Sequence, residues 1–236
     1  MRLTSTIKRM NERVERLINR FDEYIEIFKE KNLFTGPSVY FHYKTLDILR
    51  KNVDLSKVLR DDMFFDYLYA TLTSWGLHRM GPGYTKLNDI EKIRTSIRMQ
   101  EENILELAPY RIDNIKNDQV VFVALKIWSV IENLQIGVGE TKIVSGSKAL
   151  HHILPDLIPP IDGQYTLRFF YNNRGTALSQ GDEIAFKEMF PYYCKIASAR
   201  TKSIEKYVGY GMNTSKSKVI DNAIVGFVLK ELPKKK

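Results

Sequence analysis

Several residue types and patterns are scarce in this chain of 236 residues, and each absence removes a class of function. A single cysteine, Cys194, excludes an internal disulfide framework and a cysteine-based zinc site. With only four histidines, no HExxH pattern and no close carboxylate cluster, the sequence predicts neither a metal site nor a cofactor. Phosphate-loop, dinucleotide-binding and nucleophile-elbow patterns are missing as well, so the common nucleotide-dependent and serine-hydrolase chemistries have no support.

Long apolar runs are also missing. No run reaches the roughly 20 residues that a helix needs to cross a bilayer. The first residues, Met1 to Thr4, do not open a signal-peptide core. We therefore expect a cytoplasmic protein without a membrane partner. A hydrophobic content of 44% is enough for one sizeable core, and we predict a single domain over residues 1–236.

Basic residues are plentiful and concentrated near the C-terminus. The formal net charge is +8. The stretch from Lys195 to Lys236 holds ten Lys and Arg against three acidic residues, a local excess of seven positive charges. Such a concentration is typical of surfaces that bind phosphate backbones, and we expect DNA or RNA as a partner. A solvated basic face, ending in a basic tail over residues 233–236, is the simpler alternative.

Apolar periodicity predicts helices throughout. From Leu3 to Lys31 the apolar residues recur at intervals of three and four, which predicts a long N-terminal helix. We expect it, within residues 1–34, to pack on the rest of the domain, and a dimer through the same stripe is an open alternative. No strand pairs are evident, so the predicted fold class is all-α, a compact multi-helix domain. The other expected long helices cover residues 39–50, 63–75, 90–107, 119–133, 183–207 and 215–232.

The most informative stretch is IVSGSKALHHILPDLIPPIDGQYTLRFFY, residues 143–171. Ser145-Gly146-Ser147 is typical of a turn followed by a helix N-cap. A short helix should then run from Lys148 to Leu154, because Pro155 and the Pro159-Pro160 pair force an extended path. Asp162 stands where the next helix would begin.

This order resembles the helix-hairpin-helix DNA glycosylases, in which a glycine-rich hairpin precedes a Schiff-base lysine and a proline loop precedes an essential aspartate. The resemblance implies that Gly146 and Ser147 form the hairpin and that Lys148 and Asp162 are catalytic. Gly137 to Lys142 is a second candidate for the hairpin. The interval between the lysine and the aspartate is shorter than in that family. The same stretch also resembles an uncharacterised prokaryotic family with no assigned activity.

If the resemblance holds, the extruded base would enter a pocket lined by groups such as Tyr165, Trp75 or His151. A phosphate could contact backbone amides at a helix start, or basic side chains. The residues predicted to contact nucleic acid are Gly146, Ser147, His151, Tyr165, Arg168, Arg79, Lys216 and Lys218. Two other hypotheses stay open. One is a non-catalytic nucleic-acid-binding protein. The other is a helical protein in which the SK-LHH-PPID stretch has a structural or small-ligand role.

Overall fold

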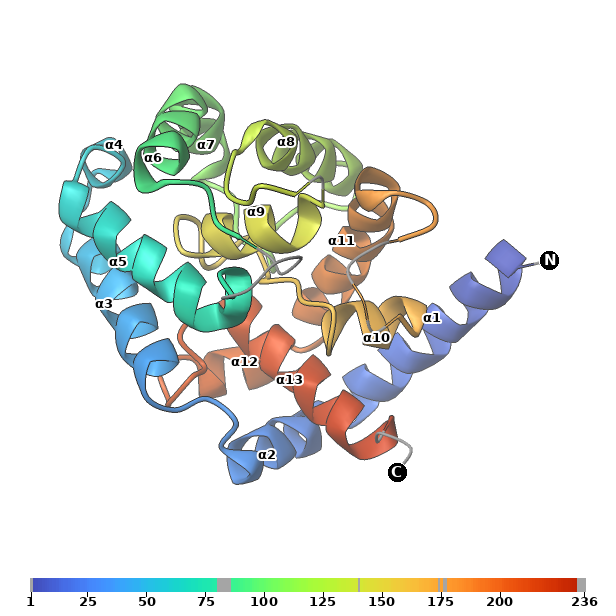
Figure 1. Cartoon of the computed structure of the whole chain (residues 1–236). Helices are drawn as coiled ribbons and strands as arrows, with labels where there is room; N and C mark the ends of the chain where they lie inside the picture. Colours follow the sequence, from blue (N-terminus) through green and yellow to red (C-terminus); the bar gives the residue numbers. More distant parts are fainter. Residues whose placement is uncertain (1, 80–85, 140, 174, 176–177, 233–236) are drawn as a thin grey trace.

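The computed structural model describes residues 2–79, 86–139, 141–173, 175 and 178–232 (Figure 1). Within these residues the fold is all-α, as predicted, and the only extended pairing is an isolated antiparallel bridge between Leu87 and Gly137. The basic tail over residues 233–236 lies outside the described part. No helix in that part is both long and apolar enough to cross a bilayer.

The helices follow one another with short connections, and a π-helical turn, η1, ends the fifth. Their bounds are α1 Arg2–Asn19, α2 Phe21–Lys31, α3 Pro37–Lys51, α4 Leu55–Val58, α5 Asp62–Leu72, η1 Thr73–Leu77, α6 Ile90–Met99, α7 Glu101–Leu107, α8 Val120–Asn133, α9 Ile143–His151, α10 Thr166–Tyr171, α11 Asp182–Ala199, α12 Thr201–Tyr207 and α13 Lys216–Glu231. Their buried apolar side chains form one continuous core.

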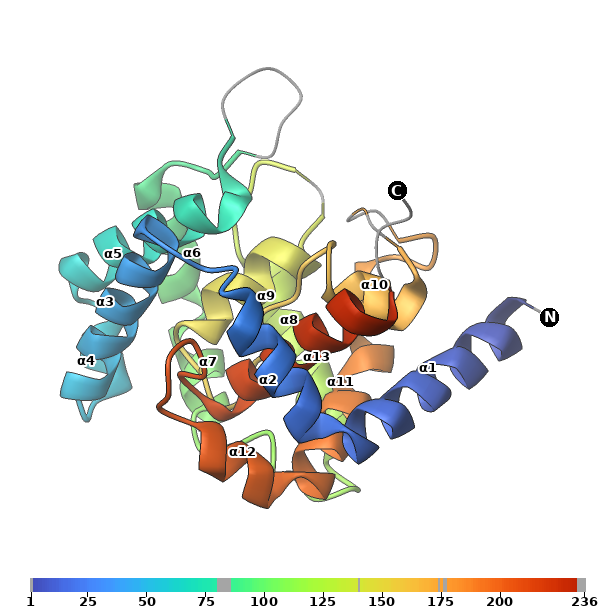
Figure 2. The same ribbon diagram turned by 90° about the horizontal axis from the view of Figure 1, so that it is seen from below.

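Helix α13 is the central element of the C-terminal half. It packs closely on α2, as Figures 1 and 2 both show, and it also contacts α10, α11 and α12. Gly226 permits the close approach to α2, because a Cβ at this position would collide with the backbone carbonyl of Tyr24. The side chains from Ser217 to Val228 are all buried. The helix expected to carry a basic surface is therefore largely internal.

The predicted N-terminal helix is two helices rather than one. The chain leaves helical geometry at Arg20, with φ −123° and ψ 32°, and α2 continues from Phe21. The expected apolar stripe is nevertheless buried on both sides of the break, at Met10, Val14, Leu17, Phe21, Tyr24 and Phe28. The first part of α1 extends beyond its neighbours in both views (Figures 1 and 2), and Ile7 is 43% exposed.

The predicted hairpin at Gly146 and Ser147 is wrong, because both residues lie inside α9. The amide of Gly146 donates to the carbonyl of Lys142 at 2.8 Å as part of the helix, and its Cα packs on Ile131, where a Cβ would be 2.8 Å from Cγ2. Ser147 is fully buried, and its hydroxyl accepts from the amide of Ile161 at 3.0 Å. Neither residue can offer its backbone to a phosphate. Small side chains here serve helix packing rather than a turn.

Candidate functional site

A cavity of about 640 Å³ lies between helix α13 and the segment from Val144 to Tyr165, which belongs to the most informative stretch of the sequence. Its walls come from the α2–α3 connection, the start of α3, η1, α9, the segment that precedes α10, and α13. The side chains of interest on these walls are Phe34, Trp75, Arg79, Lys148, Asp162, Tyr165, Lys218 and Asp221. Two lysines, two aspartates and three aromatic rings thus share one concave site.

Lys148 reaches the cavity from α9 and is only partly exposed. Its Nζ donates to the backbone carbonyl of Trp75 at 3.0 Å and lies 6.0 Å from the centroid of the Trp75 ring. Among the described carboxylates none forms an ion pair with it. Burial lowers the pKa of Lys148, while Asp162 and then Asp221 oppose that shift. A lysine with a lowered pKa is more readily a neutral amine, the form that acts as a nucleophile.

Asp162 lies on the segment that leads into α10. One carboxylate oxygen, Oδ1, accepts from the amide of Tyr165 at 2.6 Å, and its carbonyl accepts from the amide of Leu167 at 2.9 Å. The side chain thus stabilises the turn over residues 163–165 that leads into α10. Asp162 also faces the cavity, where it acts electrostatically on Lys148. A capping role and a role in the cavity are compatible.

Lys218 and Asp221 form a buried ion pair at the wall made by α13. Lys218 Nζ is 2.5 Å from Asp221 Oδ2, and the two side chains are 2% and 3% exposed. The ammonium also lies 5.0 Å from the Phe34 ring centroid and 5.3 Å from that of Trp75. Burial raises the pKa of Asp221 to about 6, against the opposing effect of Lys218. Lys218 was predicted to contact phosphate from the surface, but it is an internal residue.

Three histidine rings, those of His42, His151 and His152, pack against the ring of Trp75. His42 Nδ1 lies 2.9 Å from His152 Nε2, His152 Nδ1 lies 2.8 Å from the Lys148 carbonyl, and His42 Nε2 lies 2.8 Å from the Thr214 hydroxyl. Because a carbonyl only accepts, His152 must donate from Nδ1, and His42 must then donate from Nδ1 to His152. Thr214 completes the chain as a donor. One neutral tautomer of each ring satisfies every bond.

The charged forms of these histidines are disfavoured. Burial lowers the pKa of His42 and His151 well below the usual value, and lowers that of His152 to about 4. His151 was predicted to line the base pocket, but it is completely buried and does not line the cavity. Its ring lies 6.3 Å from the Trp75 ring, roughly parallel to it. The histidines therefore position Trp75 and Lys148.

The other predicted contact residues are dispersed. Tyr165 and Arg79 do line the cavity. Arg168 is 8% exposed, and its carbonyl accepts from Arg13 Nη1 at 2.9 Å. Lys216 forms an ion pair with Asp113 at 2.5 Å and does not line the cavity. Lys148, Asp162, Tyr165, Arg79 and Lys218 are thus brought together, while Arg168, Lys216, Gly146, Ser147 and His151 are not part of the cavity wall.

An anion at a helix start was also expected near residues 137–148, and the protein supplies one itself. The amides of Lys142 and Ile143, at the beginning of α9, both donate to Asp182 Oδ2, at 2.6 and 3.0 Å. A carboxylate at this end is favoured by the helix dipole and by the free amides. Within the alternative hairpin, Gly137 to Lys142, Glu140 lies outside the described residues. The helix start is occupied by Asp182, so a phosphate would have to displace a carboxylate there.

Seven cations of the basic C-terminal stretch lie in the described residues, and five of them form ion pairs with carboxylates. Its described ion pairs join Lys195 to Glu15, Arg200 to Asp22, Lys216 to Asp113, Lys218 to Asp221 and Lys230 to Glu23. Four of the five partners come from other helices or connections. The local charge excess counted in the sequence therefore does not translate into an equal excess on one surface.

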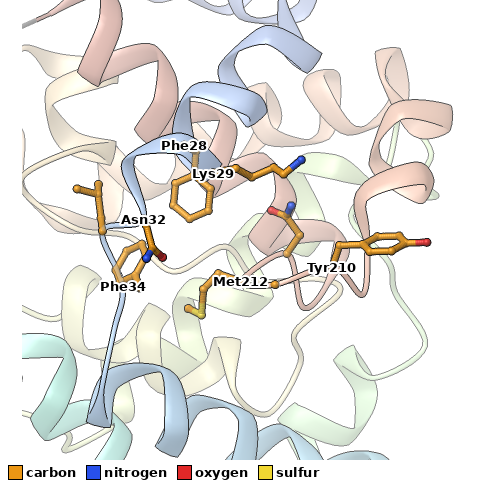
Figure 3. A pocket seen from close by; sticks show the side chains of 9 residues that line it. Phe28, Lys29, Asn32, Phe34, Tyr210 and Met212 are labelled. Atoms are coloured by element: carbon orange, nitrogen blue, oxygen red, sulfur yellow. The ribbon is translucent and has the colours of Figure 1, made fainter.

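A smaller hollow of about 200 Å³, drawn in Figure 3, shares two lining residues with the cavity. It lies between the end of α2 and the loop before α13. Figure 3 shows the rings of Phe28 and Phe34 close together, with centroids 5.9 Å apart. Leu33 and Phe34 line both hollows, so this short connection separates them.

Two residues of the cavity, Phe34 and Asp221, were not singled out from the sequence. A signal for Asp221 was present: between Ser217 and Leu229, Lys218 and Asp221 are the only charged residues in an otherwise apolar and small-residue run. An i,i+3 pair of opposite charge in such a run indicates a buried pair. Phe34 lies in a short connection, where periodicity carries no information.

Comparison with known proteins adds no assignment: no family model, curated protein or solved structure matches the chain. Among the described residues, no group of three or more His, Cys, Asp or Glu side chains could hold a metal ion. Function must therefore be argued from the cavity.

Proposed function

We propose that this protein acts on nucleic acid as a glycosylase or abasic-site lyase, with Lys148 as the attacking amine and Asp162 as its carboxylate partner. The observation that carries the proposal is that these two residues, which come from separate segments, line the same cavity. The cavity also contains the aromatic rings of Trp75 and Tyr165, against which an extruded base could stack. Its volume of about 640 Å³ is in the usual range for a small-molecule site.

The chemistry requires Lys148 as a free amine. Burial lowers its pKa, and its nearest bonded partner is a carbonyl, so no carboxylate fixes it as an ammonium. The amine attacks C1′ of the sugar, and the bond from C1′ to the base breaks with its electron pair leaving on the base. The attacking nitrogen passes a proton to Asp162, and the departing base takes up a proton from water. Asp162 then returns its proton to the ring oxygen O4′ as the bond from C1′ to O4′ breaks, and the opened sugar is joined to Lys148 as an iminium. Water then hydrolyses the iminium and releases Lys148.

Borohydride trapping tests this proposal. The full-length protein is incubated with abasic and damaged duplexes in the presence of borohydride, which reduces an iminium to a stable amine. A covalent adduct is expected with the wild type and none with Lys148→Ala. Lys195→Ala is a matched control, because Lys195 is an exposed lysine paired with Glu15 far from the cavity. An adduct that persists in Lys148→Ala, or no adduct on any substrate, would contradict the proposal.

Asp162→Asn is the companion variant. The amide oxygen of asparagine can still accept from Tyr165, so the capped turn before α10 is retained while the charge is lost. Adduct formation should slow by roughly 100-fold, the usual scale for losing a general acid or base. An unchanged rate with a normally folded protein would restrict Asp162 to its capping role.

A second candidate is a binding site for a small ligand without covalent chemistry. The observation that favours it is the internal pairing of the C-terminal cations, which leaves less free positive charge for a nucleic-acid backbone. The third hypothesis, a non-catalytic nucleic-acid-binding protein using the C-terminal face, is weakened for the same reason. Its marker is affinity that falls steeply with salt. Salt-sensitive duplex binding without any adduct would favour it.

A further inference from the structure

The buried pair on α13 contains an oxygen without a hydrogen-bond partner. Asp221 Oδ2 is bonded to Lys218 Nζ, but Asp221 Oδ1 has no partner among the described residues. The side chain is 3% exposed, so bulk water does not satisfy this oxygen freely. Leaving a buried polar atom unpaired is unfavourable, and more so for a charged group. A ligand that donates to Oδ1 would remove this cost.

Lys218 also has unused donor capacity. An ammonium carries three N–H donors, and the contacts of Nζ are one carboxylate oxygen and the faces of two aromatic rings, Phe34 and Trp75. Both members of the pair line the cavity that holds Lys148. The pair thus combines an acceptor without a partner and a donor with unused N–H groups in two residues of the cavity wall, and the Lys218 ammonium lies near the ring of Trp75. A planar group with a donor beside an acceptor is complementary to this arrangement.

We propose that Lys218 and Asp221 recognise the hydrogen-bonding edge of a nucleobase, with Asp221 Oδ1 accepting from a base N–H and Lys218 donating to the adjacent carbonyl or ring nitrogen. This inference rests on the proposed function, since it identifies what part of the substrate enters the cavity. It assigns the base-reading role to α13, whereas Lys148 and Asp162 act on the sugar. Trp75 and Phe34, which flank the Lys218 ammonium, form the aromatic side of the same site.

Calorimetric titration with nucleosides tests the inference without any reaction at Lys148. The ligands are uridine, guanosine, cytidine and adenosine, each paired with an analogue whose edge N–H groups are replaced by methyl groups. For uridine the analogue is 3-methyluridine. The expected result is millimolar or tighter binding of at least one nucleoside, with its methylated analogue at least tenfold weaker. Equal binding of the two forms, or no binding of any nucleoside, would overturn the inference.

The Asp221→Asn variant links the preference to this residue. Lys218 can only donate, so the asparagine oxygen should turn toward it and place the NH₂ group where Oδ1 stood. An acceptor at the cavity wall thereby becomes a donor. The preference for the unmethylated nucleoside should shrink at least tenfold in this variant, while Lys195→Ala, which does not touch the cavity wall, should retain it. A preference that is unchanged in folded Asp221→Asn would show that another group reads the base.

The two proposals fail in different ways. If nucleosides bind with the expected preference but borohydride traps no adduct, the base site stands and the lyase chemistry does not. If an adduct forms through Lys148 but methylated and unmethylated nucleosides bind alike, the chemistry stands and the role of Lys218 and Asp221 does not. The comparison of methylated and unmethylated ligands uses the wild-type protein, so it remains decisive even where Asp221→Asn does not fold.

Discussion

The cavity contains two lysine–aspartate pairs, and they are built differently. Lys218 and Asp221 lie three residues apart on one helix and bond directly to each other. Lys148 and Asp162 come from different segments, and each is held by backbone, Lys148 by the carbonyl of Trp75 and Asp162 by the amide of Tyr165. The first pair largely neutralises itself. In the second pair, a backbone group orients each side chain, and the two side chains do not bond to each other.

Lysine and aspartate side chains can therefore serve a ligand site in two different ways. A directly bonded buried pair stabilises its own charged state, and removing one member leaves the other uncompensated. Groups oriented by backbone contacts can engage a substrate without first breaking an ion pair. This difference supports the two proposals, in which Lys148 and Asp162 carry out the chemistry and Lys218 and Asp221 recognise the base. Three predictions test it, beginning with the largest expected effect.

Removing the two lysines should have unequal effects on stability. Lys218→Ala leaves Asp221 buried without its cation, and the free energy of unfolding should fall by about 3–5 kcal/mol at pH 7. Lys148→Ala removes one hydrogen bond to a carbonyl, and the loss should be about 1 kcal/mol. Urea unfolding of both variants measures the difference.

A double variant serves as the control. Lys218→Met combined with Asp221→Leu replaces the ion pair by apolar side chains, so much of the stability lost in Lys218→Ala should return. Equal losses for Lys148→Ala and Lys218→Ala would remove the distinction between the two pairs.

Low pH should destabilise the protein through the three buried histidines next to Trp75, which are His42, His151 and His152. The folded pKa of His152 is about 4, below its usual 6.5, and burial lowers those of His42 and His151 as well. Between pH 6.5 and 4 the unfolded chain therefore binds protons that the folded chain does not, and stability falls as pH falls. For His152 alone the effect is on the order of 3 kcal/mol.

Protonation of Asp221 has the opposite effect on the stability of the protein. Its folded pKa of about 6 exceeds the usual 3.8, so its share of stability grows as pH falls through the same window. At low pH the destabilising effect of the three histidines should exceed the stabilising effect of Asp221. Urea unfolding at pH 7 and pH 4 measures the net change, and His152→Gln should reduce it. Equal stability at the two pH values would mean that the histidines are not buried as neutral rings.

The smallest effect is expected for an exposed pair of the C-terminal stretch. Lys195 and Glu15 are 49% and 53% exposed, and water screens such a pair. Lys195→Ala should change the free energy of unfolding by less than about 1 kcal/mol and should leave borohydride trapping unchanged. A loss as large as that of Lys218→Ala would show that burial does not distinguish the pairs.

Much of the fold could be predicted because helix formation follows local periodicity. The expected helices over residues 39–50, 63–75 and 119–133 overlap α3, α5 and α8 closely. The hairpin at Gly146 was wrong because glycine and serine suit both turns and tight helix packing. Only the proximity of Ile131 on α8 distinguishes the two, and that contact is absent from any local pattern.

The candidate site was partly accessible from the sequence. The stretch around Lys148 and Asp162 stood out for its unusual residue types, and it does line the cavity. The buried position of Lys218 could not be predicted, because a lysine in a lysine-rich stretch usually lies on the surface. The role of Asp182 at the start of α9 could not be predicted either, because Asp182 is 40 residues from Lys142 in the sequence. These roles depend on neighbours that are distant in the sequence.

By itself, the sequence determined the helical class, the apolar periodicity of the buried N-terminal stripe, and the i,i+3 spacing that joins Lys218 to Asp221, because each depends on residues within a few turns. Only the tertiary structure decided that Lys148 and Asp162 share a cavity with that pair, and that Lys195, Arg200 and Lys230 are neutralised by α1 and α2. Burial and pairing across long separations result from the packing of whole helices, and that packing sets which charges remain available to a ligand.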